Sequence, residues 1–551
     1  MMNKLLFIVE QNAPIINYLG VTNYIEYYNQ SSDKEITEWL ISNKKLFENK
    51  EKIIIPCCLG TNDTTYHGIY IATHIRLTKE LSKERLLPIV FYNADSKGYI
   101  LQKQINESQL KTSLLLYTKG CTLIQDPNNI SSIDLEAISE NELISDVLPN
   151  LTLFQTRDSG HKLANEWGVF RLAEYANLKL DIEKPTSLYT KYKDSYIKSK
   201  LKVSSTKIGL CKKTCNALLI DDKADKGWFK VVEFILRNRI VDPSLDVTLD
   251  VKRSYEEAIE ITDYHKFDII FLDLRLYDWE DSSSQRIPLE KFSGARLLKK
   301  IKDENLGIQV IIFTASNKIW NIDKLKELGA DCYYIKESPE FIPNESFSQI
   351  NYDELIRSIE ICLSRKPLKN IFSSINIIKS HINNSVAKST ISQQLKREIN
   401  IQIDLSYKLI SEAKEDNQYA VSYIVLYRCI ELIADYFTMK DTNGKWILKD
   451  GRKMIIYEYS SSSKTYKLST KSIEPSTSHK LIAFAKQSLA LQDRFLLNYY
   501  WDNFRRNTFI HFGKPSKPEE KAEYKSIFGY NGFSSLLSFI ELIFKEISNK
   551  R

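Results

Sequence analysis

Short apolar runs alternate with helical patterns through about the first two thirds of the chain. The clearest runs are LLFIV (5–9), KIIIP (52–56), LLPIVF (86–91), LLLY (114–117), ALLI (217–220), DIIFLDL (268–274), VIIF (310–313) and CYYI (332–335). Runs of this length between polar segments are typical of buried parallel strands, whereas the intervening stretches, such as 294–306, have the helical period. The alternation predicts doubly wound α/β domains.

The pattern changes near residue 370. From there the chain has long helical periods, interrupted by a polar insert at about 441–475 that holds a hairpin or is mobile. This pattern predicts an all-α domain. We therefore expect four parts: an α/β domain at 1–125, a helical connector at 126–204, a second α/β domain at 205–368 and a helical domain at 369–551.

The composition is that of an ordinary soluble protein. Of the 551 residues, 43% are hydrophobic and 27% charged, which excludes wholesale disorder. The net charge of +7 gives weak support for a polyanionic partner. Eight cysteines are too sparse for a disulfide framework, and no apolar stretch reaches the roughly 18–20 residues that span a bilayer. We expect a cytoplasmic protein without a membrane segment.

Polar side chains stand at the ends of the predicted strands in the central domain. Asp221 and Asp222 follow ALLI, and Asp273 follows IIFL. Thr314 follows VIIF, and Lys336 follows CYYI. Because the carboxyl ends of neighbouring parallel strands converge, we expect all five residues to meet. The three carboxylates are suitable ligands for Mg²⁺, Asp273 is the expected nucleophile that forms an aspartyl-phosphate, and the lysine and threonine are expected to bind its phosphoryl oxygens.

Residues 215–340 resemble a response-regulator receiver domain, through LLIDD, FLDLRL, SGARLLKKIK, VIIFTAS and LGADCYYIKES. The resemblance implies a flavodoxin-like fold and a histidine kinase or other phosphodonor as partner. It also implies that Thr314 and Tyr333 form the switch pair that reports phosphorylation. A receiver that is never phosphorylated is the alternative. Unlike simple receivers, this chain carries a polar insert at 277–292 that either covers the pocket or contacts a partner.

The N-terminal domain repeats the pattern of the central one with its chemistry replaced. LLFIVEQN parallels ALLIDDK, and KIIIPCCLG parallels DIIFLDLRL. Other residue types then occupy the functional positions: Glu10-Gln11 at the acidic pair, Cys57 or Cys58 at the phosphoacceptor, Tyr92 or Asn93 at the threonine and Gln125 at the lysine. We expect a degenerate receiver-like domain that serves dimerisation, partner docking or ligand sensing. Some other small α/β domain is the alternative.

The last helical pattern carries Arg506, Asn507 and His511, and it stops soon afterwards at Gly513 and Pro515. Asn507 and His511 lie four residues apart and share a helical face, which the long side chain of Arg506 also reaches. These groups suit RNA cleavage without a metal. His511 exchanges a proton with the 2′-OH nucleophile or the leaving 5′-oxygen, and Arg506 stabilises charge on the phosphate.

Residues 400–551 resemble HEPN-domain ribonucleases in this spacing and in the helix LYRCIELIADYF (426–437). The resemblance implies a composite active site across a homodimer, an RNA substrate and no cofactor for cleavage. The domain combination resembles that of antiviral abortive-infection ribonucleases, which implies a role in phage defence. Two alternatives stay open. Arg506 and His511 also complement a helix dipole, and the helical domain of a non-enzymatic response regulator would bind protein or nucleic acid.

Several other residues have structural interpretations. We expect Arg428 and Glu431 to form an ion pair on one helix. We expect His67 and His74 to lack carboxylate partners, and we interpret them as surface or packing residues. An aromatic cluster suits either the dimer interface or the core of the helical domain: Tyr499, Tyr500, Trp501, Phe504 and Phe509.

Overall fold

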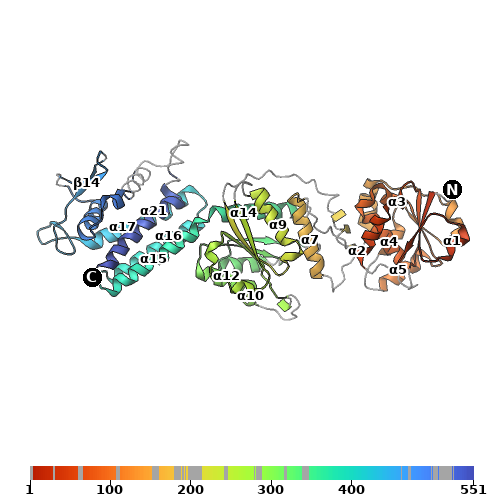
Figure 1. Ribbon diagram of the computed structural model, residues 1–551, viewed down its shortest axis with the longest axis horizontal. Helices are drawn as coiled ribbons and strands as arrows, with labels where there is room; N and C mark the ends of the chain where they lie inside the picture. Colours follow the sequence, from red (N-terminus) through yellow and green to blue (C-terminus); the bar gives the residue numbers. More distant parts are fainter. Residues whose placement is uncertain are drawn as a thin grey trace.

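The computed structural model contains two α/β domains and a helical domain in a row along its long axis (Figure 1). It describes residues 4–28, 32–59, 66–106, 112–151, 160–178, 188, 191–192, 194–195, 214–240, 246–277, 279–280, 288–315, 319–337, 347–460, 462–469, 473–497, 499, 507, 524 and 527–550. No helix within these ranges is long and apolar enough to cross a membrane.

The N-terminal domain is built on a five-stranded parallel sheet in the order β2-β1-β3-β4-β5. Its strands are β1 (Leu5–Glu10), β2 (Tyr24–Tyr27), β3 (Lys52–Pro56), β4 (Ile89–Tyr92) and β5 (Cys121–Ile124). Its main helices are α1 (Pro14–Leu19), α2 (Asp33–Ser42), α3 (Lys44–Phe47), α4 (His67–Leu77) and α5 (Lys97–Asn106). This strand order is that of doubly wound flavodoxin-like folds.

The central domain has the same order, β7-β6-β8-β9-β10, and all its strand pairs are parallel. Its strands are β6 (Cys215–Ile220), β7 (Val247–Lys252), β8 (Ile269–Leu272), β9 (Gln309–Thr314) and β10 (Cys332–Ile335). Its helices are α9 (Trp228–Ile235), α10 (Tyr255–Ile259), α12 (Ser293–Glu304), α13 (Ile319–Glu327) and α14 (Phe347–Ser364). The predicted pair of doubly wound domains is therefore confirmed as a fold.

One apolar run does not form the predicted strand. Residues Thr112–Tyr117, which include LLLY, form a 3₁₀ helix, and the edge strand is β5. Leu115 and Leu116 are completely buried there. A short buried run has the same hydrophobicity in a helix as in a strand, so its pattern does not separate the two.

Each sheet is buried on both faces, which explains the continuous apolar runs. In the central sheet, Leu219 and Phe271 face the core formed with α9 and α14, whereas Leu218 and Ile270 face the core formed with α10 and α12. The alternation follows from the two-residue period of a strand.

The connector predicted at 126–204 divides its packing between the two domains. Leu143, Val147 and Leu151 belong to the core of the N-terminal domain. The helix α7 (Gly160–Tyr175) instead contributes Val169 and Leu172 to the core of the central domain. One part of the connector thus packs on the N-terminal domain and another part packs on the central domain.

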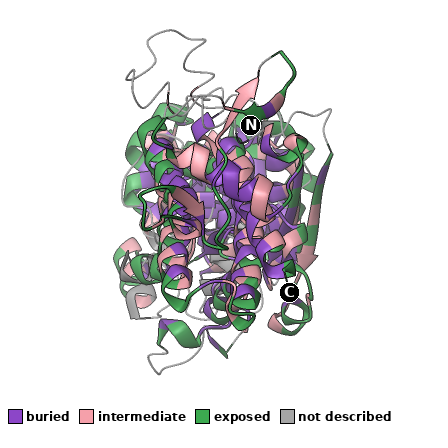
Figure 2. Ribbon diagram, turned by 90° about the vertical axis from the view of Figure 1, so that its left-hand side faces the viewer, coloured by how far each residue is buried: buried purple, intermediate pink, exposed green. Residues whose placement is uncertain are grey.

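The C-terminal part is mainly helical, as predicted, with α15 (Pro367–Ala387), α16 (Gln393–Glu412), α17 (Asp416–Phe437), α18 (Thr477–Ala483) and α21 (Tyr530–Asn549). Viewed along the long axis (Figure 2), the buried residues lie in the interior and the exposed ones along the outer faces. The polar insert forms two small antiparallel pairs, β11 (Thr438–Lys440) with β12 (Trp446–Leu448) and β13 (Tyr457–Ser460) with β14 (Thr465–Leu468). The hairpin alternative for this insert is confirmed.

Two ion pairs to a buried carboxylate join the helical domain to the central one. Lys366 and Lys369, at the start of α15, lie 2.7 and 2.8 Å from the carboxylate oxygens of Asp268, which is 6% exposed. Asp268 precedes β8, so α15 docks at the amino edge of the sheet.

A glycine lets a helix approach the sheet closely in each α/β domain. A Cβ built on Gly68 would lie 1.8 Å from the carbonyl oxygen of Pro56, and one built on Gly294 would lie 2.1 Å from that of Asp273. Both distances are far below van der Waals contact. The two glycines therefore occupy equivalent places in the two domains.

We predict that Gly68→Ala destabilises the N-terminal domain by about 1–3 kcal/mol, because the backbone of β3 or α4 must move to admit the methyl group. Gly98→Ala, on α5, is the matched control, since its Cβ would meet no atom within 4 Å. The measurement is hydrogen-exchange protection of the β3 amides in the full chain. Equal protection in the two variants would contradict the close approach.

Candidate functional site

Three carboxylates meet at the carboxyl edge of the central sheet, as predicted. Asp221 and Asp222 follow β6, and Asp273 follows its neighbour β8. One ligand oxygen of each lies within 4.8 Å of the others. Hard oxygen donors at this spacing fit Mg²⁺, which prefers carboxylate ligands and keeps several of its waters. When bound, the ion neutralises phosphate charge.

Lys336 bridges two of these carboxylates from the end of β10. Its Nζ atom lies 2.8 Å from Oδ2 of Asp221 and 2.5 Å from Oδ2 of Asp273. The lysine is 7% exposed, and the rings of Trp228 and Phe313 lie 5.2 and 5.3 Å from its ammonium group. The predicted partner of the phosphoryl oxygens is therefore held beside the predicted nucleophile.

The predicted switch residues lie on the same face of the sheet. Thr314 ends β9 opposite Ile335, and its backbone oxygen accepts a hydrogen bond of 2.7 Å from the Lys336 amide. Tyr333 pairs with Ile312 two residues earlier. Side chains two residues apart on a strand share a face. Thr314 therefore lies beside Lys336 at the strand end, and its side chain shares a face of the sheet with the Tyr333 ring.

Burial and neighbouring charges shift the pKa values of the pocket. Burial raises the pKa of Asp273; Lys336 opposes the shift and Asp221 adds to it. Burial also raises the pKa of Asp222. Burial alone would lower the pKa of Lys336, but Asp221 and Asp273 outweigh it, so the lysine stays charged. The site therefore combines a buried cation with carboxylates that bind protons more readily than exposed ones.

The insert at 277–292 begins with a buried anchor. Glu280 is 4% exposed, and its Oε1 atom accepts a hydrogen bond of 2.7 Å from the Ser293 amide at the start of α12. Its Oε2 atom accepts one of 2.6 Å from the Ser293 hydroxyl. Residues 281–287 lie outside the described ranges, so the choice between covering the pocket and contacting a partner stays open.

The sequence did not reveal a second group of charges next to the pocket. Glu337, directly after Lys336, lies 3.9 Å from Arg171 of α7, and Arg171 lies 3.5 Å from Asp194. Asp194 also lies 2.8 Å from Lys79 of the N-terminal domain. These residues are far apart in the chain and belong to no local pattern, so only the packing of the connector brings them together.

The described residues of the N-terminal domain contain no acidic cluster like that of the central domain. The structure also corrects the expected alignment by one residue. Because Gly68 and Gly294 are equivalent, Pro56 occupies the place of Asp273, rather than Cys57 or Cys58. Following the strand registers from there, Val9 and Glu10 take the places of the acidic pair. Asn93 takes the place of the threonine, and Asp126, rather than Gln125, takes the place of the lysine. Proline has no side-chain nucleophile, so phosphotransfer at this position is excluded.

The interpretation of His74 as lacking a carboxylate was wrong. His74 is completely buried, and its Nε2 atom lies 3.2 Å from Oδ1 of Asp33 on α2. Burial lowers the pKa of His74 to about 4. Tyr70 also donates a hydrogen bond to Asp33, and His67 bonds the Tyr27 hydroxyl at 2.6 Å. The carboxylate lies 41 residues away in the sequence, where a local pattern does not show it.

Of the three predicted RNA-cleaving residues, the structure describes only Asn507. Arg506 and His511 lie outside the described ranges, and Asn507 is half-buried. Of the aromatic cluster, Tyr499 is in the core, where its hydroxyl lies 2.9 Å from that of Tyr427, and the other four residues lie outside the described ranges. The predicted ion pair is confirmed, with Nη1 of Arg428 2.6 Å from Oε2 of Glu431.

Comparison with known proteins identifies the N-terminal domain. Residues 3–124 match the family described as the inactive receiver domain. No curated protein gives a significant match. The expectation of a degenerate receiver domain at the N-terminus is thereby confirmed, and a receiver domain indicates a signalling protein of the response-regulator type.

Solved receiver structures are also similar to parts of the chain. They include a Francisella response-regulator receiver domain (23% identity over 27% of this chain and 98% of that chain, TM-score 0.19). A CheY-like protein from Methanospirillum hungatei is 19% identical over 28% of this chain and 97% of that chain, with a TM-score of 0.20. NtrX from Brucella abortus is 12% identical over 61% of this chain and 84% of that chain, with a TM-score of 0.21.

We predict that Asp221→Asn weakens Mg²⁺ binding at least tenfold, whereas Asp225→Asn leaves it unchanged. Asp225 is a half-exposed neighbour that pairs with Lys226 at 3.8 Å, outside the cluster. Protonated carboxylates are poor ligands and the pKa of Asp273 is raised, so affinity should fall as the pH is lowered through that pKa. A Mg²⁺ titration followed by isothermal titration calorimetry measures both effects. Affinity that rises at lower pH, or equal losses in the two variants, would contradict this site.

Proposed function

We propose that this protein is a phosphorylation-responsive signalling protein whose helical C-terminal domain cleaves RNA. The observation that carries the signalling half is the buried lysine between Asp221 and Asp273, in a cluster that also contains Asp222. Such a set of charges at the carboxyl edge of a doubly wound sheet suits the capture of a phosphoryl group. Among the residues that the structure describes, this cluster is present in the central domain, and the equivalent edge of the N-terminal domain has no such cluster.

The proposed reaction at this edge is phosphoryl transfer to Asp273. A carboxylate oxygen attacks the phosphorus atom of a phosphohistidine or an acyl phosphate. A new O–P bond forms as the P–N or P–O bond to the donor breaks, and the leaving group takes the electron pair. Lys336 holds phosphoryl oxygens by charge, and the Thr314 hydroxyl donates to one of them. Asp273 must be deprotonated to attack, so its raised pKa slows the step at acidic pH.

The proposed output is metal-independent cleavage of RNA. His511 takes the proton of a 2′-OH, the 2′-oxygen attacks the adjacent phosphorus, and the bond to the 5′-oxygen breaks as that oxygen takes a proton from the protonated His511. Arg506 stabilises the charge on the phosphate, and Asn507 positions the reacting groups. The support is the spacing of these residues in a mainly helical domain, together with the resemblance to HEPN ribonucleases. In this proposal the domain acts as a homodimer in the cytoplasm, in antiphage defence by abortive infection.

A binding output is the second candidate. In it the helical domain recognises a protein or nucleic acid and performs no chemistry. One observation favours it: Asn507 is half-buried and already engaged with neighbouring groups, as a packing residue would be. The two outputs differ in whether RNA is cut.

We predict that acetyl phosphate with Mg²⁺ adds a hydroxylamine-sensitive phosphoryl group to the wild-type chain and none to Asp273→Asn. Asp225→Asn, the exposed control beside the cluster, should be labelled like wild type. Phosphate-affinity gels and intact-mass measurement follow the reaction. Label that persists in Asp273→Asn would contradict the assignment of the nucleophile. No label in the wild-type chain would favour a receiver that is never phosphorylated.

We predict that the wild-type chain, treated with the phosphodonor or untreated, cuts a labelled single-stranded RNA in EDTA to leave a 2′,3′-cyclic phosphate. His511→Ala and Arg506→Ala should each slow this cleavage at least about 100-fold, the usual contribution of a general acid–base group for the histidine and of a charge-stabilising group for the arginine. Arg397→Ala, an exposed cation on α16, is the control. A difference between treated and untreated protein would show that Asp273 controls the output. Binding of RNA without cleavage in any state would favour the second candidate.

A further inference from the structure

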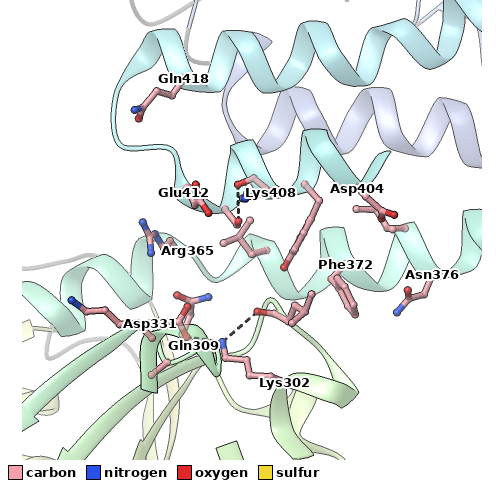
Figure 3. Close-up of a pocket in the computed structure, with 18 of the residues that line it drawn as sticks. Lys302, Gln309, Asp331, Arg365, Phe372, Asn376, Asp404, Lys408, Glu412 and Gln418 are labelled. Atoms are coloured by element: carbon pink, nitrogen blue, oxygen red, sulfur yellow. Dashed lines mark hydrogen bonds and ion pairs between the residues drawn. The ribbon is translucent and has the colours of Figure 1, made fainter. Parts of the chain in front are cut away.

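A second cavity lies between the central domain and the helical domain, away from the acidic pocket. This cleft has a volume of about 1020 Å³ (Figure 3). Both bodies line it: the central domain supplies Lys302 and Gln309, α15 supplies Phe372, and α16 supplies Tyr407 and Lys408. Small-molecule sites reach roughly this size and are commonly placed between domains.

Two buried polar groups in the cleft wall have unmet hydrogen-bonding capacity. Gln309 is 1% exposed; its Nε2 atom donates to the Gly307 oxygen at 2.8 Å, and its Oε1 atom has no partner in the part of the chain that the structure describes. Tyr407 is 8% exposed, and its hydroxyl also lacks a partner within the described ranges. Buried polar atoms in folded proteins are nearly always paired. An acceptor and a hydroxyl left open in one cleft therefore suit a ligand that donates to the first and bonds the second.

The charge of the cleft favours an anion. Three carboxylates and six cations line it, the cations being Lys302, Lys326, Arg365, Lys379, Lys408 and Lys414. Asp331 lies 2.7 Å from Lys302, and Asp404 lies 2.5 Å from Lys379. The four other cations share the cleft with a single further carboxylate, Glu412. An excess of lysine and arginine of this kind attracts phosphate groups.

The aromatic side chains of the cleft favour a flat ring. The rings of Phe372 and Tyr407 lie 5.3 Å apart between centroids, at an angle of 55°. Aromatic faces of this kind contact planar ligands at their edge or face. A ring with an exocyclic amine would also supply the donor that Oε1 of Gln309 lacks.

We propose that this cleft binds a nucleotide, with its phosphate among the cations and its base between Tyr407 and Gln309. Because the lining residues come from both bodies, the ligand contacts the central and helical domains at once. It therefore stabilises their relative orientation, in addition to the ion pairs that Asp268 forms with Lys366 and Lys369. Binding at this site depends on neither the acidic pocket nor the cleavage of RNA.

The test uses N-methylanthraniloyl-AMP as the probe, followed by fluorescence anisotropy with the full chain in EDTA. We expect saturable binding that unlabelled AMP competes away, with adenosine and inorganic phosphate at least tenfold weaker. Lys408→Glu on α16 and Lys326→Glu on the central domain should each weaken binding at least tenfold. Tyr407→Phe keeps the ring, loses the hydroxyl and should weaken it about threefold.

Two controls isolate the cleft. Arg397→Glu reverses an exposed charge on α16 outside the cleft, and Asp273→Asn alters the acidic pocket; both should bind like wild type. Circular dichroism and melting curves show that each variant is folded.

Four results would each overturn the proposal: no saturable binding up to millimolar probe, unchanged binding in both lysine variants, phosphate competing as well as AMP, and displacement by a single-stranded oligoribonucleotide but not by AMP. The last result would assign the cleft to nucleic acid.

Discussion

The buried ammonium group of Lys336 is the interaction on which the carboxyl edge of the central domain depends. Asp221 and Asp273 are almost fully buried, and carboxylates removed from water at this spacing would repel each other and take up protons. The lysine lies within 2.8 Å of both and offsets part of that cost. With Asp222, the cluster still has more negative than positive charge, which leaves room for a divalent cation. The charge balance that stabilises the fold at this edge therefore also suits the phosphoryl group that we propose it receives.

The two receiver-like domains show that this chemistry is separable from the fold. Both have the same strand order and apolar cores on both faces of the sheet. In both, a glycine lets a helix closely approach one central strand, β3 in the N-terminal domain and β8 in the central one. The functional residues stand just beyond the strand ends, outside these cores. The position of Asp273 is held by Pro56 in the N-terminal domain, and proline has no side-chain nucleophile. The same fold thus occurs with and without the acidic cluster among the described residues, and fold alone does not establish function.

Most of the sheet and the acidic site could be predicted from the sequence, because both depend on local patterns. Apolar runs marked the strands, and polar residues directly after them marked the site. Three features depend on tertiary packing and could not be predicted. The close approach of Gly68 to Pro56 decided that Pro56, and not Cys57, is equivalent to Asp273. The pairs Asp33–His74 and Arg171–Glu337 join residues 41 or more positions apart in the chain. Leu115 and Leu116, within the run at Thr112–Tyr117, are as fully buried in a helix as they would be in a strand.

Strand β9 relates the two sites of the central domain to each other. Gln309 begins this strand and lines the cleft, whereas Thr314 ends it beside Lys336. At about 3.3 Å per residue, the two ends are roughly 17 Å apart, too far for direct contact between a phosphoryl group and a ligand in the cleft. All six residues of β9 are buried, and densely packed strands change shape little. Any coupling between the sites therefore has to act through movement of whole elements packed on this sheet, such as α13, whose Lys326 lines the cleft and lies over the ring of Tyr333.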